Sequence, residues 1–499
     1  MSQQNSVQQN SVQPAEHFDV VIVGAGISGV GAAYHLKDQT PNKSFVVLDN
    51  LASFGGTWYT HTYPGIRSDS DLYTFGYRFK PWVGAPIASA EEILSYMGEV
   101  IEENGLDKNI RYHHQMTTAN WCNENKQWTV KGVRKDTGEA VHFTANFLWM
   151  CQGYYEHAKG YTPQWDNMEN FKGEMVHPQT WPDDLDYQNK NVVVIGSGAT
   201  AATVVPAIAD DCKHVTVLQR SPTYFIPGAN ENLLVDQLRH LNIDEHWIHE
   251  IARRQILSDQ DEFTRRAIEE PDVVTSELLE GVKALVGEDY DMSHFTPNYR
   301  PWRQRVAFVP DGDIFVGIKS GKAEMVTDEI ERFTEHGIAL KSGRELPADI
   351  VVTATGFNLS VLGGINFSID DKPVDFADTV TYRGMMFTGV PNMAWVFGYF
   401  RASWTLRVDI VADFICRLFQ TMDDKGVHSV TPQLRTEEQA MELGPWIDPE
   451  NFNPSYLMRS MHLMPKSGVT NEWRHSQDYW REKDELPKID LEQAPFIYR

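Results

Sequence analysis

Two stretches of the chain share one pattern: a run of apolar residues, then a glycine-rich turn, then a segment of helical composition. FDVVIV (18–23) precedes the first turn, and NVVVI (191–195) precedes the second. Unbroken apolar runs are typical of parallel strands that are buried on both faces. The pattern therefore predicts an α/β protein with two dinucleotide-binding, Rossmann-like domains.

Polar and amphipathic segments elsewhere predict how the two domains are arranged. Residues 1–16 are polar, and we expect them to form a disordered tail. The segment ELPADIVVTATGFN (345–358) predicts a strand that completes the first domain. We therefore expect the first domain over 17–150 and 341–499, with the second domain, 151–340, inserted in it. Dense charge with helical apolar spacing predicts a solvated helical insertion at about 228–290.

The first turn has the spacing of a dinucleotide-binding turn. Gly24, Gly26 and Gly29 form a GxGxxG pattern directly after the predicted strand. These glycines permit the tight turn, the approach of a pyrophosphate and close packing of helix on strand. Asp49 ends the next apolar run, where an acid accepts hydrogen bonds from ribose hydroxyls and repels a 2′-phosphate. This domain is predicted to bind FAD or NAD, with Gly356 allowing the backbone to approach the ligand.

The second turn differs at the position that selects the cofactor. GSGATA (196–201) has alanine in place of the third glycine. The next apolar run ends in Gln219, Arg220 and Ser221 instead of an acid. An arginine can pair with a 2′-phosphate and a serine can donate to it, so this domain is predicted to bind NADPH.

Composition excludes several classes of function. The 499 residues carry a formal net charge of −25, which argues against nucleic acid as a partner. The four cysteines form no CxxC pair, so the sequence predicts neither a metal site nor a dithiol redox centre. The sequence also lacks an apolar stretch of about 18 residues and a signal peptide. We therefore expect a cytoplasmic protein without an integral membrane span, and the oligomeric state stays open.

Two longer motifs point to a family. GGTWYTHTYPGIRSD (55–69) fills every defined position of the pattern [A/G]GxWxxxx[F/Y]P[G/M]xxxD. Phe171, Gly173, His177 and Trp181 fill the pattern FxGxxxHxxxW[P/D] within FKGEMVHPQTWP. Together the two motifs resemble those of type I Baeyer–Villiger monooxygenases, which are class B flavoprotein monooxygenases. The resemblance extends from about residue 17 to nearly the C-terminus.

The resemblance assigns roles to individual residues. Arg305 matches the active-site arginine of the family, and Asp69 would orient it through a bidentate ion pair. Flavin-contacting positions are matched by Ser28, Asp49, Gly56, Thr57, Trp58, Asp69 and Met116. NADP positions are matched by Arg67, Ser68, Asp69, Gly196, Ser197, Gly198, Ala199, Thr200, Ala201, Ala202, Arg220 and Ser221. Gln304 replaces a lysine that many members have before this arginine, so we expect a relaxed preference for NADPH over NADH.

The resemblance also implies a reaction. NADPH would reduce FAD, O2 would form a C4a-peroxyflavin, and one oxygen atom would be inserted into a ketone to give an ester or lactone. Sulfides or thioamides are expected as further substrates. N- or S-oxidation without Baeyer–Villiger activity, electron transfer to a partner, and nucleotide sensing without catalysis stay open. No nucleophile accompanies His177, so the motif at 171–182 is predicted to be a joint between the domains.

Overall fold

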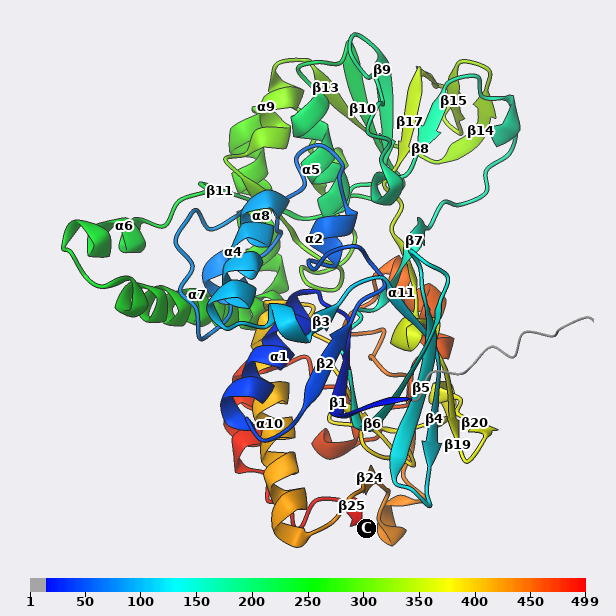
Figure 1. Ribbon diagram of the computed structural model, residues 1–499. Helices are drawn as coiled ribbons and strands as arrows, with labels where there is room; N and C mark the ends of the chain where they lie inside the picture. Colours follow the sequence, from blue (N-terminus) through cyan, green and yellow to red (C-terminus); the bar gives the residue numbers. More distant parts are fainter. Residues whose placement is uncertain (1–14) are drawn as a thin grey trace, which may run out of the picture.

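The computed structural model describes residues 15–499 of the chain. Residues 1–14, most of the expected tail, lie outside this range, and strand β1 begins at Glu16. Figure 1 shows two lobes, each built on its own sheet, with the second lobe above the first. The predicted fold class, two Rossmann-like domains with the second inserted in the first, is confirmed.

The first lobe contains a nine-stranded sheet with a parallel centre. β1 (Glu16–Val23) pairs in parallel with β2 and with β6, and Val21 lies opposite Val46 and Leu148. Both faces of β1 are covered at this point, which explains the unbroken apolar run. In spatial order the strands are β20 (Lys372–Pro373), β19 (Asn366–Ile369), β4 (His114–Cys122), β5 (Gln127–Arg134), β6 (Ala140–Met150), β1, β2 (Phe45–Leu48) and β3 (Ile110–Arg111), and β23 (Met393–Trp395) also pairs with β6.

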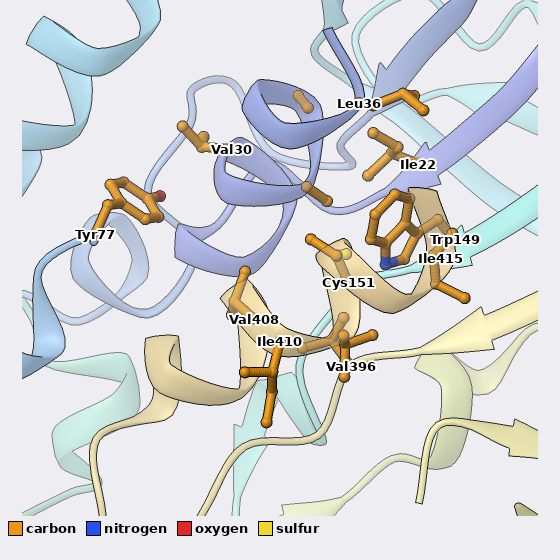
Figure 2. Close-up of a cluster of buried hydrophobic side chains, with 14 of the residues drawn as sticks. Ile22, Val30, Leu36, Tyr77, Trp149, Cys151, Val396, Val408, Ile410 and Ile415 are labelled. Atoms are coloured by element: carbon orange, nitrogen blue, oxygen red, sulfur yellow. The ribbon is translucent and has the colours of Figure 1, made fainter. Parts of the chain in front are cut away.

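Helices from the two ends of the chain pack together on this sheet. α1 (Ile27–Gln39) lies against α10 (Trp404–Lys425), and Figure 2 shows Val30 and Val408 in their common buried cluster. A Cβ atom at Gly31 would come within 2.8 Å of Val408 Cγ1, so glycine permits this close approach. The first lobe is therefore completed only by residues near the C-terminus.

The second lobe contains a five-stranded parallel sheet flanked by α5 (Ala199–Ile208) and α9 (Asp313–Lys319). Its strands in spatial order are β13 (Ala323–Thr327), β10 (His214–Gln219), β9 (Asn191–Ile195), β17 (Ile350–Thr353) and β8 (Glu174–Val176). The expected placement of β17 in the first lobe, and with it the boundary at residue 341, is wrong. β17 pairs in parallel with β9 and β8, and only the chain after it returns to the first lobe.

Two short strands carry the chain between the lobes. β7 (Tyr155–Gly160) leads into the second lobe and β18 (Phe357–Leu359) leads out of it, and the two pair antiparallel. Both connections therefore cross at one place, directly above the first sheet (Figure 1).

The helical insertion consists of α6 (Leu233–His240), α7 (Glu245–Glu269) and α8 (Pro271–Val286). α7 packs against α3 (Leu72–Phe75) of the first lobe. Its side chains His249 and Arg253 are only 2% and 6% exposed, so the expectation of a fully solvated face is wrong. α7 ties the inserted domain to the first lobe.

The last part of the chain covers the outside of the first lobe. It forms β24 (Val430–Pro432), α11 (Ser455–Ser460), α12 (Tyr479–Glu485) and β25 (Phe496–Tyr498), and β24 pairs with β25. Within residues 15–499, no helix has both the length and the apolar character needed to cross a bilayer.

Candidate active site

A cavity of about 750 Å³ lies between the two lobes. Residues from both glycine-rich turns, from the motif at 55–69 and from the loop that carries Arg305 line it. The predicted site residues among them are Gly24, Gly26, Ser28, Asp49, Gly56, Thr57, Trp58, Arg67, Asp69, Met116, Ser197, Gly198, Ala199, Thr200, Ser221, Arg305 and Gly356. The structure thus brings together segments that are far apart in the sequence.

The first turn is shaped to admit a ligand against its backbone. Gly24 has a φ of +100°, and a Cβ atom there would lie 2.7 Å from the carbonyl oxygen of Cys151. Gly26 and Gly56 face each other, since a Cβ atom on Gly56 would lie 3.2 Å from the Cα of Gly26. Gly29 does not line the cavity; a Cβ atom there would overlap the carbonyl oxygen of Gly24. Two glycines therefore form the cradle, and the third serves helix packing.

Two polar side chains of the first lobe are held in place at this cradle. Asp49 accepts hydrogen bonds from the N–H groups of Ala25, at 2.6 Å, and Leu51, at 2.8 Å. Burial raises the pKa of its carboxyl group, and the two N–H donors oppose that rise. Ser28 accepts a hydrogen bond of 2.7 Å from Nε1 of Trp404, which also lines the cavity.

The second turn presents an open backbone. Gly198 precedes α5, and a Cβ atom on it would meet no atom within 4 Å. Gly196 is instead packed tightly, because its Cβ atom would lie 2.3 Å from the carbonyl oxygen of Ala354. Ala201 and Ala202 are buried in the core of the second lobe. Gly196, Ala201 and Ala202, which were predicted to contact NADP, therefore do not line the cavity. Arg220 is exposed and lies outside the cavity lining.

Arg305 and Asp69 meet inside the cavity. Nη2 of Arg305 lies 3.1 Å from Oδ2 of Asp69, and each side chain is 39% exposed. The charge of Asp69 raises the pKa of Arg305 above its ordinary value, so the guanidinium stays protonated. The contact is an ion pair and differs from the expected bidentate pair, because no hydrogen bond joins these two side chains among residues 15–499. Both side chains line the cavity.

Tyrosines that no motif indicated surround this pair. Tyr154 and Tyr456 lie beside Arg305, with their ring centres 6.4 Å apart. Burial raises the pKa of Tyr154, an effect that the charge of Arg305 opposes. The hydroxyl of Tyr456 is buried and lies close to Tyr154 and Arg305. Tyr154 also stacks on Trp404, at 5.4 Å between ring centres.

The motif at 55–69 joins the two lobes. Arg67 donates a hydrogen bond of 2.6 Å to Asp313 at the start of α9. A Cβ atom on Gly65 would lie 2.8 Å from Cβ of Ala207, so this segment packs directly on α5. Ser68 is buried and accepts a hydrogen bond from the N–H of Ala88, and it does not line the cavity.

The motif at 171–182 lies at the crossing between the lobes and outside the cavity lining. Nε2 of His177 lies 3.2 Å from the carbonyl oxygen of Gly356, and its ring fills the place of a side chain on Gly160. A Cβ atom on Gly173 would lie 2.3 Å from the carbonyl oxygen of Asp349. Phe171 and Trp181 pack in the second lobe against Phe333 and Tyr187 respectively.

Comparison with known proteins identifies the family. Residues 22–82 match an NAD(P)-binding Rossmann-like domain, and residues 86–234 match a flavin-binding monooxygenase-like family. The chain is 46% identical over 476 residues to the FAD-containing monooxygenase EthA of Mycobacterium tuberculosis, and the match covers 94% of each chain. It is 42% identical over 477 residues to the probable FAD-binding monooxygenase AlmA of an Acinetobacter species, and this match also covers 94% of each chain.

The chain belongs to the family of FAD-containing monooxygenases. The family identification made from the two motifs is thereby confirmed.

Solved structures show that the whole monooxygenase chain has a known fold. A steroid monooxygenase bound to NADP matches with a TM-score of 0.74 at 21% identity, covering 97% of this chain and 99% of the other. OTEMO in complex with FAD and NADP matches with a TM-score of 0.76 at 19% identity, covering 97% of this chain and all of the other.

Proposed function

We propose that the protein is an NADPH-dependent Baeyer–Villiger monooxygenase. It inserts one atom of O2 between the carbonyl carbon of a ketone and a neighbouring carbon, giving an ester or lactone. The other oxygen atom leaves as water, with electrons from NADPH. The observation that carries the proposal is the Arg305–Asp69 pair inside a cavity lined by both glycine-rich turns.

The cavity fits two dinucleotides. The Gly26–Gly56 cradle and the fixed carboxylate of Asp49 suit the pyrophosphate and ribose of FAD. The open backbone at Gly198, before the N-terminus of α5, suits the pyrophosphate of NADPH, and Ser221 and Arg220 suit its 2′-phosphate. When bound, the flavin supplies electron transfer from NADPH and activation of O2.

The reaction needs a fixed positive charge where negative charge develops on oxygen. Arg305 supplies that charge, and Asp69 holds the guanidinium in place from one side. Tyr456 places a buried hydroxyl near the same point, where it can donate a hydrogen bond to the carbonyl oxygen of the substrate. The rings of Tyr154 and Trp404 keep water from this part of the cavity.

We further propose that the enzyme acts in the cytoplasm on a small ketone or sulfide. Cys122, Cys151, Cys212 and Cys416 are all free thiols, which suits a reducing compartment. Two of the strongest sequence relatives are named as monooxygenases, and structural neighbours include a cyclohexanone monooxygenase with bound ε-caprolactone.

The test is oxygen insertion from labelled O2. The FAD-loaded enzyme is incubated with NADPH, ¹⁸O2 and phenylacetone, and the products are analysed by mass spectrometry. We expect an ester that carries one ¹⁸O atom. Sulfoxide from thioanisole without any ester would favour N- or S-oxidation. Oxidation of NADPH without oxygen insertion or hydrogen peroxide would favour electron transfer to a partner.

A further inference from the structure

A second cavity, of about 890 Å³, adjoins the first. Phe400 lines both cavities, and the next residue, Arg401, lines only the second. The wall of the second cavity is mixed: polar and charged side chains alternate with apolar ones, and the apolar members include Ile268, Trp446, Ile447, Phe452, Val469 and Trp480. A site of this composition suits a ligand that has both an apolar part and a charged end.

Arg401 brings a buried positive charge to this mixed wall. Its side chain lies over the ring of Phe452, and the residue is 8% exposed. Nη2 donates hydrogen bonds to the carbonyl oxygens of Trp302, at 3.0 Å, and Asn451, at 2.8 Å. Nε has no partner, and no carboxylate of the described residues forms an ion pair with this guanidinium.

The charge persists at neutral pH despite its burial. Burial, and then the nearby charge of Arg300, lower the pKa of Arg401 to about 10. Arg300 donates to the same Asn451 carbonyl oxygen, so two guanidinium groups meet there and share neutral acceptors. Buried charges in proteins are normally paired, so this arrangement is incomplete without an anion.

The other charged groups of the cavity do not supply that anion. Asp261, Glu442 and Asp448 are exposed to water, which screens them. Asp478 is engaged in accepting the N–H of Arg481 at the start of α12, at 3.0 Å. Arg265 already has a carboxylate partner, since it lies 2.7 Å from Glu269. Of the described charged residues that line the cavity, Arg401 is the buried one.

We propose that the second cavity binds the carboxylate end of an oxo-acid substrate, with Arg401 as the partner of the carboxylate. The apolar side chains of the wall hold the adjoining part of the substrate, and the ketone passes Phe400 into the first cavity, toward Arg305. This inference rests on the proposed ketone oxidation and names its substrate class. A charged hydrogen bond to a guanidinium is among the stronger polar contacts, so the carboxylate should dominate selectivity.

Binding is tested first, without turnover. Calorimetry on the FAD-loaded enzyme compares octanoate with octanamide, which has the same chain and no charge. We expect octanoate to bind at least tenfold more tightly, and Arg401→Gln to remove that difference. The matched control is Arg254→Gln, on α7, where an exposed arginine pairs with Glu250 outside the cavity. Equal binding of the two ligands by the wild-type enzyme, or equal loss in both variants, would overturn the proposal.

Steady-state kinetics then distinguishes failure of the proposed carboxylate subsite from failure of the proposed reaction. We expect kcat/KM for 9-oxodecanoate to exceed that for its methyl ester at least tenfold, and the ratio to approach one in Arg401→Gln. Equal kcat/KM for acid and ester in the wild-type enzyme would overturn the subsite and leave the proposed function standing. Octanoate binding that depends on Arg401, with no ester formed from any ketone, would support the anion site and refute Baeyer–Villiger activity.

Discussion

The proposed chemistry depends on the guanidinium group of Arg305. Replacing it in Arg305→Met removes the fixed charge and keeps most of the side-chain volume. We expect kcat with phenylacetone to fall on the order of 10²-fold, or about 3 kcal/mol in the barrier. FAD content, read from flavin absorbance, should stay at the wild-type level, because the cradle at Gly26 and Gly56 does not involve Arg305.

Arg303 provides the control for loss of a positive charge near the site. Arg303 pairs with Glu450 at 2.9 Å and does not line the first cavity. Arg303→Met should therefore reduce kcat less than threefold, and an equal loss in the two variants would contradict the role of Arg305.

Arg220 is expected to select the nicotinamide cofactor, although it lies outside the cavity lining. Its side chain is exposed at the end of β10, where the 2′-phosphate of NADPH would reach solvent. In Arg220→Ala, KM for NADPH should rise at least tenfold, and KM for NADH should change less than twofold. Steady-state kinetics with both cofactors gives the comparison. Equal kcat/KM for the two cofactors in the wild-type enzyme would refute the NADPH assignment.

Sequence patterns identify the glycine-rich turns that bind a dinucleotide. They do not identify side chains that line the pocket but lie far apart in the sequence. The glycines at 24, 26 and 198 were visible because their spacing is local. Tyr154 and Tyr456 belong to no motif, and they meet only because the residue before β7 and the start of α11 lie side by side near Arg305. The same is true of Arg401: only the fold shows that no carboxylate of residues 15–499 pairs with it.

At the scale of elements, α7 attaches the helical insertion to the first lobe through Arg253. Nη1 of Arg253 donates to three carbonyl oxygens at the end of α3, those of Tyr73, Thr74 and Gly76, at 3.0 to 3.1 Å. Arg253→Met removes this buried donor from all three acceptors, of which Thr74 keeps a hydrogen bond from Oγ1 of Thr405, and takes away the guanidinium 3.6 Å from the buried carboxylate of Asp409. We expect the free energy of unfolding to fall by ~3 kcal/mol in urea titrations.

The next residue on α7 provides the control for that measurement. Arg254 is exposed, with a side chain 78% accessible, and its partner is Glu250. Arg254→Met should change the free energy of unfolding by less than ~0.5 kcal/mol. Comparable losses in both variants would argue against docking through Arg253.

His177 lies where β7 and β18 cross between the lobes, so we expect it to connect the lobes and not to act as a catalytic group. His177→Ala leaves a hole over Gly160 and removes the contact with the carbonyl oxygen of Gly356. Because lobe movements commonly gate such reactions, we expect the share of NADPH oxidised without product to rise at least threefold. Hydrogen peroxide and ester are measured together. His240→Ala, at an exposed position on α6, is the control, and loss of FAD from His177→Ala would contradict the joint.

Element assignments from the sequence failed where tertiary contacts override a local pattern. The strand at 350–353 is equally apolar in either sheet, and only its pairing with β9 and β8 places it in the second lobe. The dense charge of α7 indicates solvent, yet His249 and Arg253 face the first lobe. The two Rossmann-like units were predictable because strand, turn and helix are adjacent in the sequence.

At the scale of the whole molecule, buried histidines predict sensitivity to acid. Burial lowers the pKa of His249 to about 4 from an ordinary value of 6.5. Between these values the unfolded chain binds more protons than the folded chain, so stability falls as the pH falls. His249 alone accounts for a loss of about 2 kcal/mol between pH 7 and pH 5.

Two glutamine variants isolate this effect. In His249→Gln, the drop in unfolding free energy from pH 7 to pH 5 should be smaller by ~2 kcal/mol than in the wild-type protein. His246→Gln, an exposed position on the same helix, should leave the drop unchanged. Burial raises the pKa of Asp71 to about 7, which has the opposite sign, but this contribution is common to all three proteins and cancels. An identical drop in all three would refute the assignment.

The pairing of α1 with α10 means that the first lobe can be completed only late in synthesis. The ribosome releases the whole second sheet, which ends at Thr353, before it releases β23 and α10. The inserted domain can therefore fold first, while α1 and the early strands wait with their apolar faces uncovered. That interval is when the nascent chain is most exposed to aggregation and chaperone binding. It ends only when α10 closes over Val30 and Gly31.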